Sequence, residues 1–257
     1  MNIKPGFLSL IFLSALAPVA QAQPSPFREA EDNPVVDARL DPLLAAHDWR
    51  GLSLTLGGTP TDLKTTAGEM DWLKRKVDTG GNFLLAYLYA RDLWMLSLAD
   101  PQFLKLRKNA GFMALYAVDL IAVDGTACED RTAPAHRLDQ MREQLAPIFQ
   151  DVQTLSKDEK VVLVMGVAAM EHLTAPRREP HDDAVCRGGM AEIQAGLAAN
   201  NVSPPEQLPN RIGRTVTVTA PPEWKPSFRS DEDYKPEQKK TATAMVPLLL
   251  DMIGVKK

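Results

Sequence analysis

The sequence has little of the chemistry that most enzymes and metal sites display. Its 257 residues include only two cysteines and four histidines. A nucleophile elbow of the form Gly-x-Ser-x-Gly, a Gly-rich phosphate-binding loop and a dinucleotide-binding fingerprint are all missing. Hydrolases with such an elbow, P-loop nucleotidases and dinucleotide-dependent enzymes are therefore not indicated. We expect no catalytic residue and no cofactor.

Long apolar runs are missing as well. A helix needs about twenty apolar residues to cross a bilayer. The run from 83 to 98 contains the adjacent charges Arg91 and Asp92, and the run from 161 to 170 is only half that length. Both segments are typical of interior helices in a globular protein, so we expect no stable membrane insertion of the mature chain.

The N-terminus has the pattern of a secretory signal peptide. Lys4 precedes an apolar stretch from residue 7 to 17, and Ala20-Gln21-Ala22 supplies the small residues of a cleavage site. The pattern predicts a signal peptide over 1–22, cut after Ala22. No cysteine follows that site to carry a lipid, so we expect a soluble periplasmic or secreted protein.

The charge balance argues against nucleic acid as a partner. The formal net charge is -4, and the short basic clusters at 74–76, 105–108 and 177–178 lie among acidic residues or beside predicted helix ends. Solvated helix surfaces explain such clusters without a polyanionic ligand.

Cys128 and Cys186 are the only cysteines, and both remain after export. An even pair in an oxidising compartment usually forms a disulfide, whereas a metal site needs more ligands close by. We therefore predict a Cys128–Cys186 disulfide. It would close a loop of nearly sixty residues and stabilise the fold by about 4 kcal/mol in the chain-entropy picture.

Helical periodicity covers most of the mature chain and predicts an all-α protein. Apolar residues recur at helical spacing, and cap residues precede several segments: Asp41 before Pro42, Asn82, and Ser156 with Glu159. The expected helices are 41–56 as two short pieces or one kinked piece, 61–77 capped by Thr61 or Asp62, 83–98, 101–123, 134–152, 156–173 and 183–199. Short connections predict antiparallel helical hairpins packed as a bundle or short helical array. We expect one domain, 41–257, after a flexible lead-in, 23–40.

The pattern changes after residue 200. Prolines become frequent, and valine alternates with threonine from Thr215 to Thr219, which is typical of a strand. No second strand is evident, so we expect an extended Pro-rich arm, about 200–234, lying over the helical body. A C-terminal helix, about 236–253, is predicted to follow, kinked at Pro247 and ended by Gly254.

Two short motifs are similar to those of enzymes but lack the required context. Residues 121–126 resemble the phosphatase motif of the haloacid dehalogenase superfamily, yet Ala122 stands where that motif has its nucleophilic aspartate. Asp78-Thr79-Gly80 matches the short signature of aspartic proteases, but it occurs once and follows a predicted helix. Helix-ending turns explain both motifs.

Three histidines, His136, His172 and His181, lie between the two cysteines. His172 next to Glu171, and His181 next to Asp182, could converge as zinc ligands, but the spacing fits no metal-binding motif. Histidines near helix ends are also common without a metal.

Charged residues within the predicted interior helices need partners. Arg91, Asp92 and Asp119 are costly to bury unless they are paired. We expect at least one pair to meet across helices as a structural ion pair. The alternative is a polar floor in a ligand groove.

Together these patterns predict an exported, non-enzymatic module that binds a protein or peptide partner in the bacterial envelope. The alternative is a metal-dependent hydrolase or metal-binding protein that uses His172, His181 and nearby carboxylates.

Overall fold

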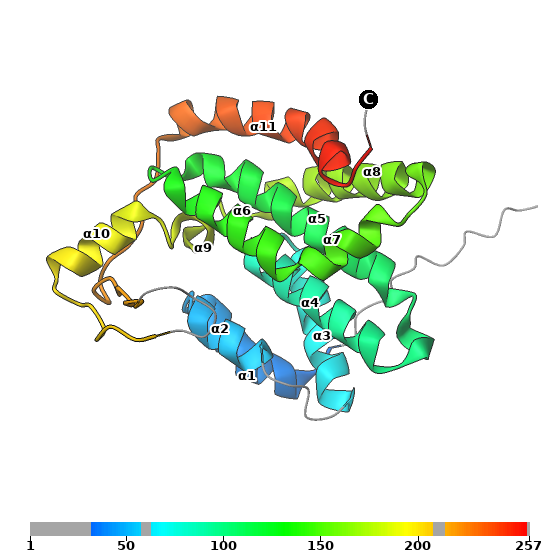
Figure 1. Cartoon of the computed structure of the whole chain (residues 1–257), viewed down its shortest axis with the longest axis horizontal. Coiled ribbons are helices and arrows are strands. Elements are labelled where there is room, and N and C mark those ends of the chain that lie inside the picture. Colours follow the sequence, from blue (N-terminus) through cyan, green and yellow to red (C-terminus); the bar gives the residue numbers. More distant parts are fainter. Residues whose placement is uncertain (1–31, 58–62, 208–213, 256–257) are drawn as a thin grey trace, which may run out of the picture.

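The computed structural model describes residues 32–57, 63–207 and 214–255 and is all-helical in these residues (Figure 1). The predicted signal peptide, and the caps expected at Thr61 or Asp62, lie outside them. The α-helices are α1 (Pro34–Ala45), α2 (Trp49–Leu56), α3 (Leu63–Asp78), α4 (Phe83–Ala99), α5 (Leu106–Asp124), α6 (Thr132–Gln144), α7 (Ala146–Gln153), α8 (Lys157–Thr174), α9 (Asp183–Cys186), α10 (Met190–Ala198) and α11 (Asp231–Met252). Short 3-10 helices are η1 (Pro101–Phe103), η2 (Gly125–Ala127) and η3 (Ala175–Arg177). The all-α class is confirmed, and the antiparallel hairpin arrangement stays a prediction.

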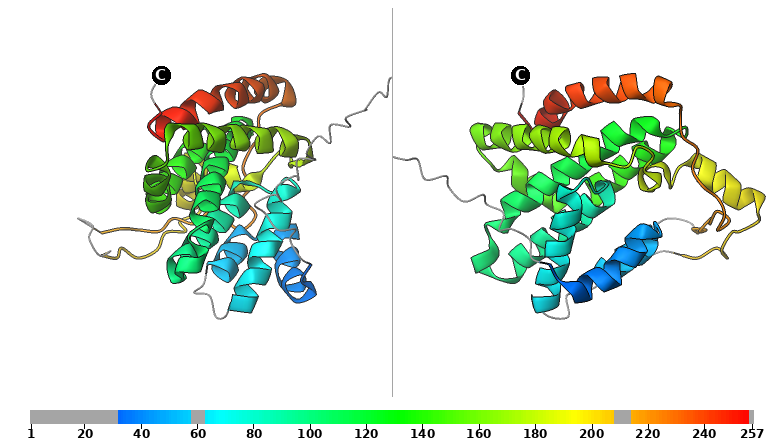
Figure 2. Two further views of the ribbon diagram at one scale, coloured as in Figure 1. Left: turned by 90° about the vertical axis from the view of Figure 1, so that its right-hand side faces the viewer. Right: turned by 180° about the vertical axis from the view of Figure 1, so that it is seen from behind.

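Helix α5 forms the centre of the protein. It packs against α4, α6, α7, α8 and α11, and its side chains Leu115, Tyr116, Leu120 and Ile121 are fully buried. Figures 1 and 2 show α11 and α8 on one side of α5, and α1 to α3 on the other. The segment Leu106–Ala127 is long and apolar enough to cross a membrane, but 83% of the 18-residue apolar window within it is buried inside the protein. That burial is typical of the core helix of a globular fold.

Two predicted helix starts are confirmed in detail. The Asn82 side chain accepts a hydrogen bond from the backbone N–H of Leu85 at 3.4 Å and begins α4. At the start of α8, Ser156 and Glu159 form the reciprocal capping box, with each side chain accepting from the other's backbone N–H. Local side-chain chemistry fixes these boundaries.

The N-terminal boundary differs from the prediction. Helix α1 begins at Pro34 with Asn33 as its cap, so part of the expected lead-in is helical. Val36 and Leu40 are buried, and this burial stabilises the earlier start. Asp41 is therefore inside α1 and caps nothing; its carboxylate accepts a hydrogen bond from Trp72 Nε1 at 2.9 Å.

Two predicted helices are each divided in the structure. The segment expected at 134–152 forms α6 and α7, which meet at Leu145, just before Pro147 in the first turn of α7. The segment expected at 183–199 forms α9 and α10, separated at Gly188, whose φ of 83° is readily adopted only by glycine. The C-terminal helix also begins earlier than predicted, at Asp231, with Ser230 as its cap.

The segment after α10 pairs with itself, which corrects the expectation that no second strand is present. Isolated antiparallel bridges join Val202 to Val218 and Glu206 to Thr215. The two sides run through a Pro-rich stretch, so the described residues form bridges but no regular strand. Together with α10, this segment projects from one end of the helical body in Figures 1 and 2.

The predicted disulfide is present. Cys128 and Cys186 are both buried, and their Cα atoms are 5.3 Å apart. Cys128 follows η2, and Cys186 ends α9, so the bond joins the end of the central helical segment to the chain just before Gly188. It therefore positions the segment that forms one wall of the cleft described below.

Candidate functional site

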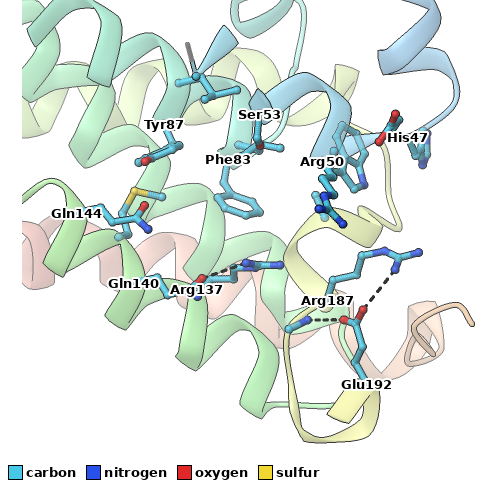
Figure 3. A pocket seen from close by; sticks show the side chains of 18 of the residues that line it. His47, Arg50, Ser53, Phe83, Tyr87, Arg137, Gln140, Gln144, Arg187 and Glu192 are labelled. Atoms are coloured by element: carbon cyan, nitrogen blue, oxygen red, sulfur yellow. Dashed lines mark hydrogen bonds and ion pairs between the residues drawn. The ribbon is translucent and has the colours of Figure 1, made fainter. Parts of the chain in front are cut away.

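A large cleft in the described part of the chain has a volume of about 910 Å³. Its walls come from α2, α4, α6 and the connection between α9 and α10, which are distant in sequence (Figure 3). Its lining side chains include His47, Trp49, Arg50, Ser53, Phe83, Tyr87, Arg91, Arg137, Gln140, Met141, Gln144, Arg187 and Glu192. Aromatic and apolar groups thus share this site with several guanidinium groups.

The cleft is basic although the whole chain is acidic. Four arginines line it, Arg50, Arg91, Arg137 and Arg187, against two carboxylates, Asp48 and Glu192. A concave site with one sign of charge concentrates ligands of the opposite sign, because the protein walls reduce the screening by water. The lining therefore favours an anionic ligand.

Two of these arginines are satisfied within the protein. Arg91 Nη2 donates to Asp92 Oδ1 at 2.6 Å and to the carbonyl of Leu56. Arg187 lies 3.7 Å from Asp183 and 3.5 Å from Glu192 and also stacks near the ring of Trp224. Their charge is thus largely compensated before any ligand arrives.

Arg137 differs from them. Its Nη1 donates to Gln140 Oε1 at 3.0 Å, its Nε is buried without a hydrogen-bond partner, and no carboxylate of the described residues forms an ion pair with it. Burial lowers the pKa of Arg137, and the nearby Glu192 acts in the opposite direction. A guanidinium with unused donors thus lines the cleft.

His47 lies at the edge of the cleft but is held by carboxylates. Its Nδ1 is 3.1 Å from Asp183 Oδ1, which also accepts from Trp49 Nε1 at 2.8 Å, and its Nε2 is 3.6 Å from Glu179. Ser53 lines the same cleft, yet it forms no hydrogen bond with His47 in the described structure. A hydroxyl nucleophile needs an adjacent base, and none is hydrogen-bonded to the Ser53 side chain among the described residues.

The structure does not bring together the histidines of the alternative, metal-dependent reading. His181 stacks on Phe228 and lies 3.8 Å from Asp231, while His172 is exposed on α8. His136 bonds to the carbonyl of Gly188. Among residues 32–57, 63–207 and 214–255, no group of three His, Cys, Asp or Glu side chains could hold a metal ion.

The expected pairing of buried charges across helices is wrong for the residues that we named. Arg91 pairs with its neighbour Asp92 in the same helix, and Asp119 Oδ2 is buried without a hydrogen-bond partner in the described residues. A different pairing does cross helices: Arg178 binds Asp124 at 3.0 Å and Glu171 at 2.8 Å. Arg91 pairs with Asp92 because the two residues are neighbours in the chain, so this ion pair forms without aligning a second helix.

The buried carboxylates near Arg178 have raised pKa values. Burial raises the pKa of Asp124 to about 6, although the Arg178 charge opposes this shift. Burial and the charge of Asp124 raise the pKa of Asp182 to about 7. Asp124 belongs to the rejected phosphatase-like motif, and its position at the end of α5 agrees with a helix-ending turn. We interpret this cluster as a structural network of charged side chains below the surface.

The rejected Asp78-Thr79-Gly80 motif also ends a helix. Asp78 is the last residue of α3, and Gly80 has a φ of 98°. Arg177 donates to the backbone carbonyl of Asp78 at 2.9 Å, which satisfies an otherwise free group at the helix end. The interpretation as a Gly-terminated helix is therefore confirmed.

Sequence reasoning missed the cleft and Arg137 in particular. One local signal was present: no acidic residue stands three or four positions from Arg137 on either side, so α6 itself offers no ion-pair partner. Gln140 and Gln144 follow at helical spacing and continue the same polar surface. The other walls could not be predicted, because they come from distant segments.

Comparison with known protein families, with curated protein sequences and with solved structures finds no match to this chain, so its function has to be inferred from the geometry of the cleft.

Proposed function

We propose that this chain is an exported, non-enzymatic binding protein whose cleft receives a segment of a protein or peptide partner in the bacterial envelope. The observation that carries the proposal is the cleft of about 910 Å³, in which aromatic walls face arginines. Ligand pockets in proteins typically span about 300–1,000 Å³. The cleft thus has room for several residues of a partner rather than for a single ion.

Two further features support binding over catalysis and export over retention. The only histidine in the cleft, His47, contacts carboxylates and no nucleophile. The disulfide is of a kind that persists in oxidising compartments, which agrees with the predicted signal peptide over 1–22. Both observations support our proposal of a mature protein in the periplasm or outside the cell.

Site-specific photo-crosslinking in exporting cells tests this proposal. A benzoylphenylalanine at Gln144, which is exposed and lines the cleft, should capture a discrete partner. The same group at Gln150, exposed on α7 outside the cleft, is the matched control and should capture far less. The cross-linked protein should begin at Gln23, because the signal peptide has been removed.

Equal cross-linking from both positions, or none from Gln144, would contradict the proposal. Stoichiometric zinc in protein purified without chelators, lost in a His172→Ala variant, would instead support the metal-dependent alternative.

A further inference from the structure

We infer that Arg137 is the specificity-determining residue of the cleft, and that it binds a carboxylate that stands next to an apolar, preferably aromatic, side chain of the partner. This inference rests on the proposed function and names the chemistry of the segment that the cleft receives. The partner's carboxylate binds the guanidinium of Arg137, and the partner's apolar side chain packs against the cleft wall beside it.

Arg137 has hydrogen-bond donors that the described residues do not use. A buried charge is costly unless it is paired and hydrogen-bonded. Arg137 uses one donor on Gln140, and its Nε has no partner in the described residues. A guanidinium presents two parallel donors that match a carboxylate, and such charge-assisted pairs are roughly twice as strong as neutral hydrogen bonds. The Nε of Arg137 is inaccessible to solvent, so a carboxylate in the cleft would bind the Nη donors that Gln140 leaves free.

The guanidinium of Arg137 lies against the backbone at Gly188 and lines the cleft. A Cβ atom added at Gly188 would lie 3.2 Å from both Cζ and Nη2 of Arg137. The backbone at Gly188 therefore lies close beside the guanidinium group, and a larger residue there would press on it. Figure 3 shows the guanidinium groups of Arg137, Arg187 and Arg50 around one common space, with the ring of Phe83 beside it. A ligand in this space reaches Arg137 without displacing a helix.

The arginines of the cleft differ in whether a carboxylate of the protein already neutralises them. Arg91 and Arg187 are already paired with carboxylates, whereas Arg137 is not. Arg50 is exposed at the rim and forms no ion pair with the described residues. Glu192 lies near enough to influence Arg137, and it would repel a group with two negative charges. Arg137 is half-buried, has no ion pair with the described residues and lies near an acid, an arrangement that favours a singly charged carboxylate over a phosphate.

Apolar side chains form part of the cleft lining. Phe83, Leu88 and Met141 line the cleft, and each is at least nine-tenths buried, so they form its floor. Tyr87 is partly exposed beside them. An aromatic side chain placed here gains ring contacts in addition to simple burial. The cleft therefore recognises a carboxylate and a ring together.

Calorimetric titration with two matched probes tests the inference. N-acetylphenylalanine carries a carboxylate beside a ring, and N-acetylphenylalaninamide is its neutral counterpart. The full mature protein should bind the acid at least about tenfold more tightly than the amide, a ratio that corresponds to about 1.4 kcal/mol. Inorganic phosphate should not compete with the acid.

Two variants assign the preference to one residue. Arg137→Gln keeps a polar side chain but removes the charge, and it should bind the acid and the amide equally. Arg142→Gln, on an exposed position of the same helix outside the cleft, is the matched control and should retain the preference. Arg137 forms no ion pair with the described residues that the substitution would break, and circular dichroism of Arg137→Gln checks that the helix content is unchanged.

A third probe separates the two sources of a carboxylate. N-acetylaspartylphenylalaninamide carries the acid on a side chain. If it binds more tightly than N-acetylphenylalanine, the partner's acid is on a side chain. If N-acetylphenylalanine binds more tightly, the partner's acid is at a chain terminus. Equal binding of the neutral amide and of both acidic probes by the wild-type protein would overturn the inference. So would an acid preference that persists in Arg137→Gln. Cross-links from Gln144 that persist in either case would leave the proposed function standing, so the two failures are distinguishable.

Discussion

An Asp119→Asn variant should be more stable than the wild-type protein by several kcal/mol at about pH 9, with little difference at about pH 4. Burial, together with the charge of Glu171, raises the pKa of Asp119 to about 8 from the model-peptide value of 3.8. Each pKa unit corresponds to about 1.4 kcal/mol. The cost of ionising this one buried carboxyl group is therefore a large fraction of typical folding stability.

The sign follows from proton linkage. The folded protein keeps the Asp119 proton at pH values where the unfolded chain has lost it, because the folded pKa is raised. The stability from this group is therefore fully present below about pH 4 and is lost as the pH rises to about 8. Asparagine carries no titrating proton, so the variant escapes that loss.

Urea unfolding at several pH values measures this effect. Asp139→Asn, which changes the net charge equally on an exposed position of α6, is the control. Asp119→Leu removes the polar atoms altogether and should reproduce the stabilisation at high pH. If Asp119→Asn follows the wild-type curve at every pH, then Asp119 is paired in solution and the structure is wrong at this position.

Replacing both cysteines by alanine should lower the free energy of unfolding by about 4 kcal/mol. The bond joins residues separated by 58 positions, so its loss frees a large closed loop in the unfolded chain. The same region holds the chain entering α11, because Arg229 donates to the carbonyl of Ala127 and Glu129 to that of Ser227. Looser packing there adds to the entropic loss.

Guanidinium-induced unfolding of the double variant, Cys128→Ala with Cys186→Ala, provides the measurement. The wild-type protein unfolded in a reducing agent is the control and should lose a similar amount of stability. A loss below about 1 kcal/mol would be within the ordinary range for single substitutions. Such a small loss would show that the disulfide does not hold these segments together.

The sequence predicted the helical class and the boundaries that have local causes. Asn82 and Ser156 cap helices because their side chains bind backbone N–H groups only three residues away. Gly80 marks the end of α3 through its own backbone freedom. The disulfide was predictable because only two cysteines exist. Each of these features depends on nearby residues or on a simple count.

The missed features depend on contacts between distant segments. Helix α1 starts early because Val36 and Leu40 become buried against the rest of the fold, which no local pattern reveals. The pairing of residues 201–206 with 215–219 was missed because Pro204 and Pro205 interrupt the first of these segments. The cleft unites five segments that are distant in sequence, so its charge balance appears only after folding.

The most direct test of the central claim, that the functional site is the cleft around Arg137, is a nuclear magnetic resonance titration of the isotope-labelled protein with N-acetylphenylalanine. We predict saturable shifts of backbone amide signals confined to the cleft, including Tyr87, Gln140 and Gly188. Shifts centred on His172 and the exposed surface of α8, or no shift at any position, would contradict the claim.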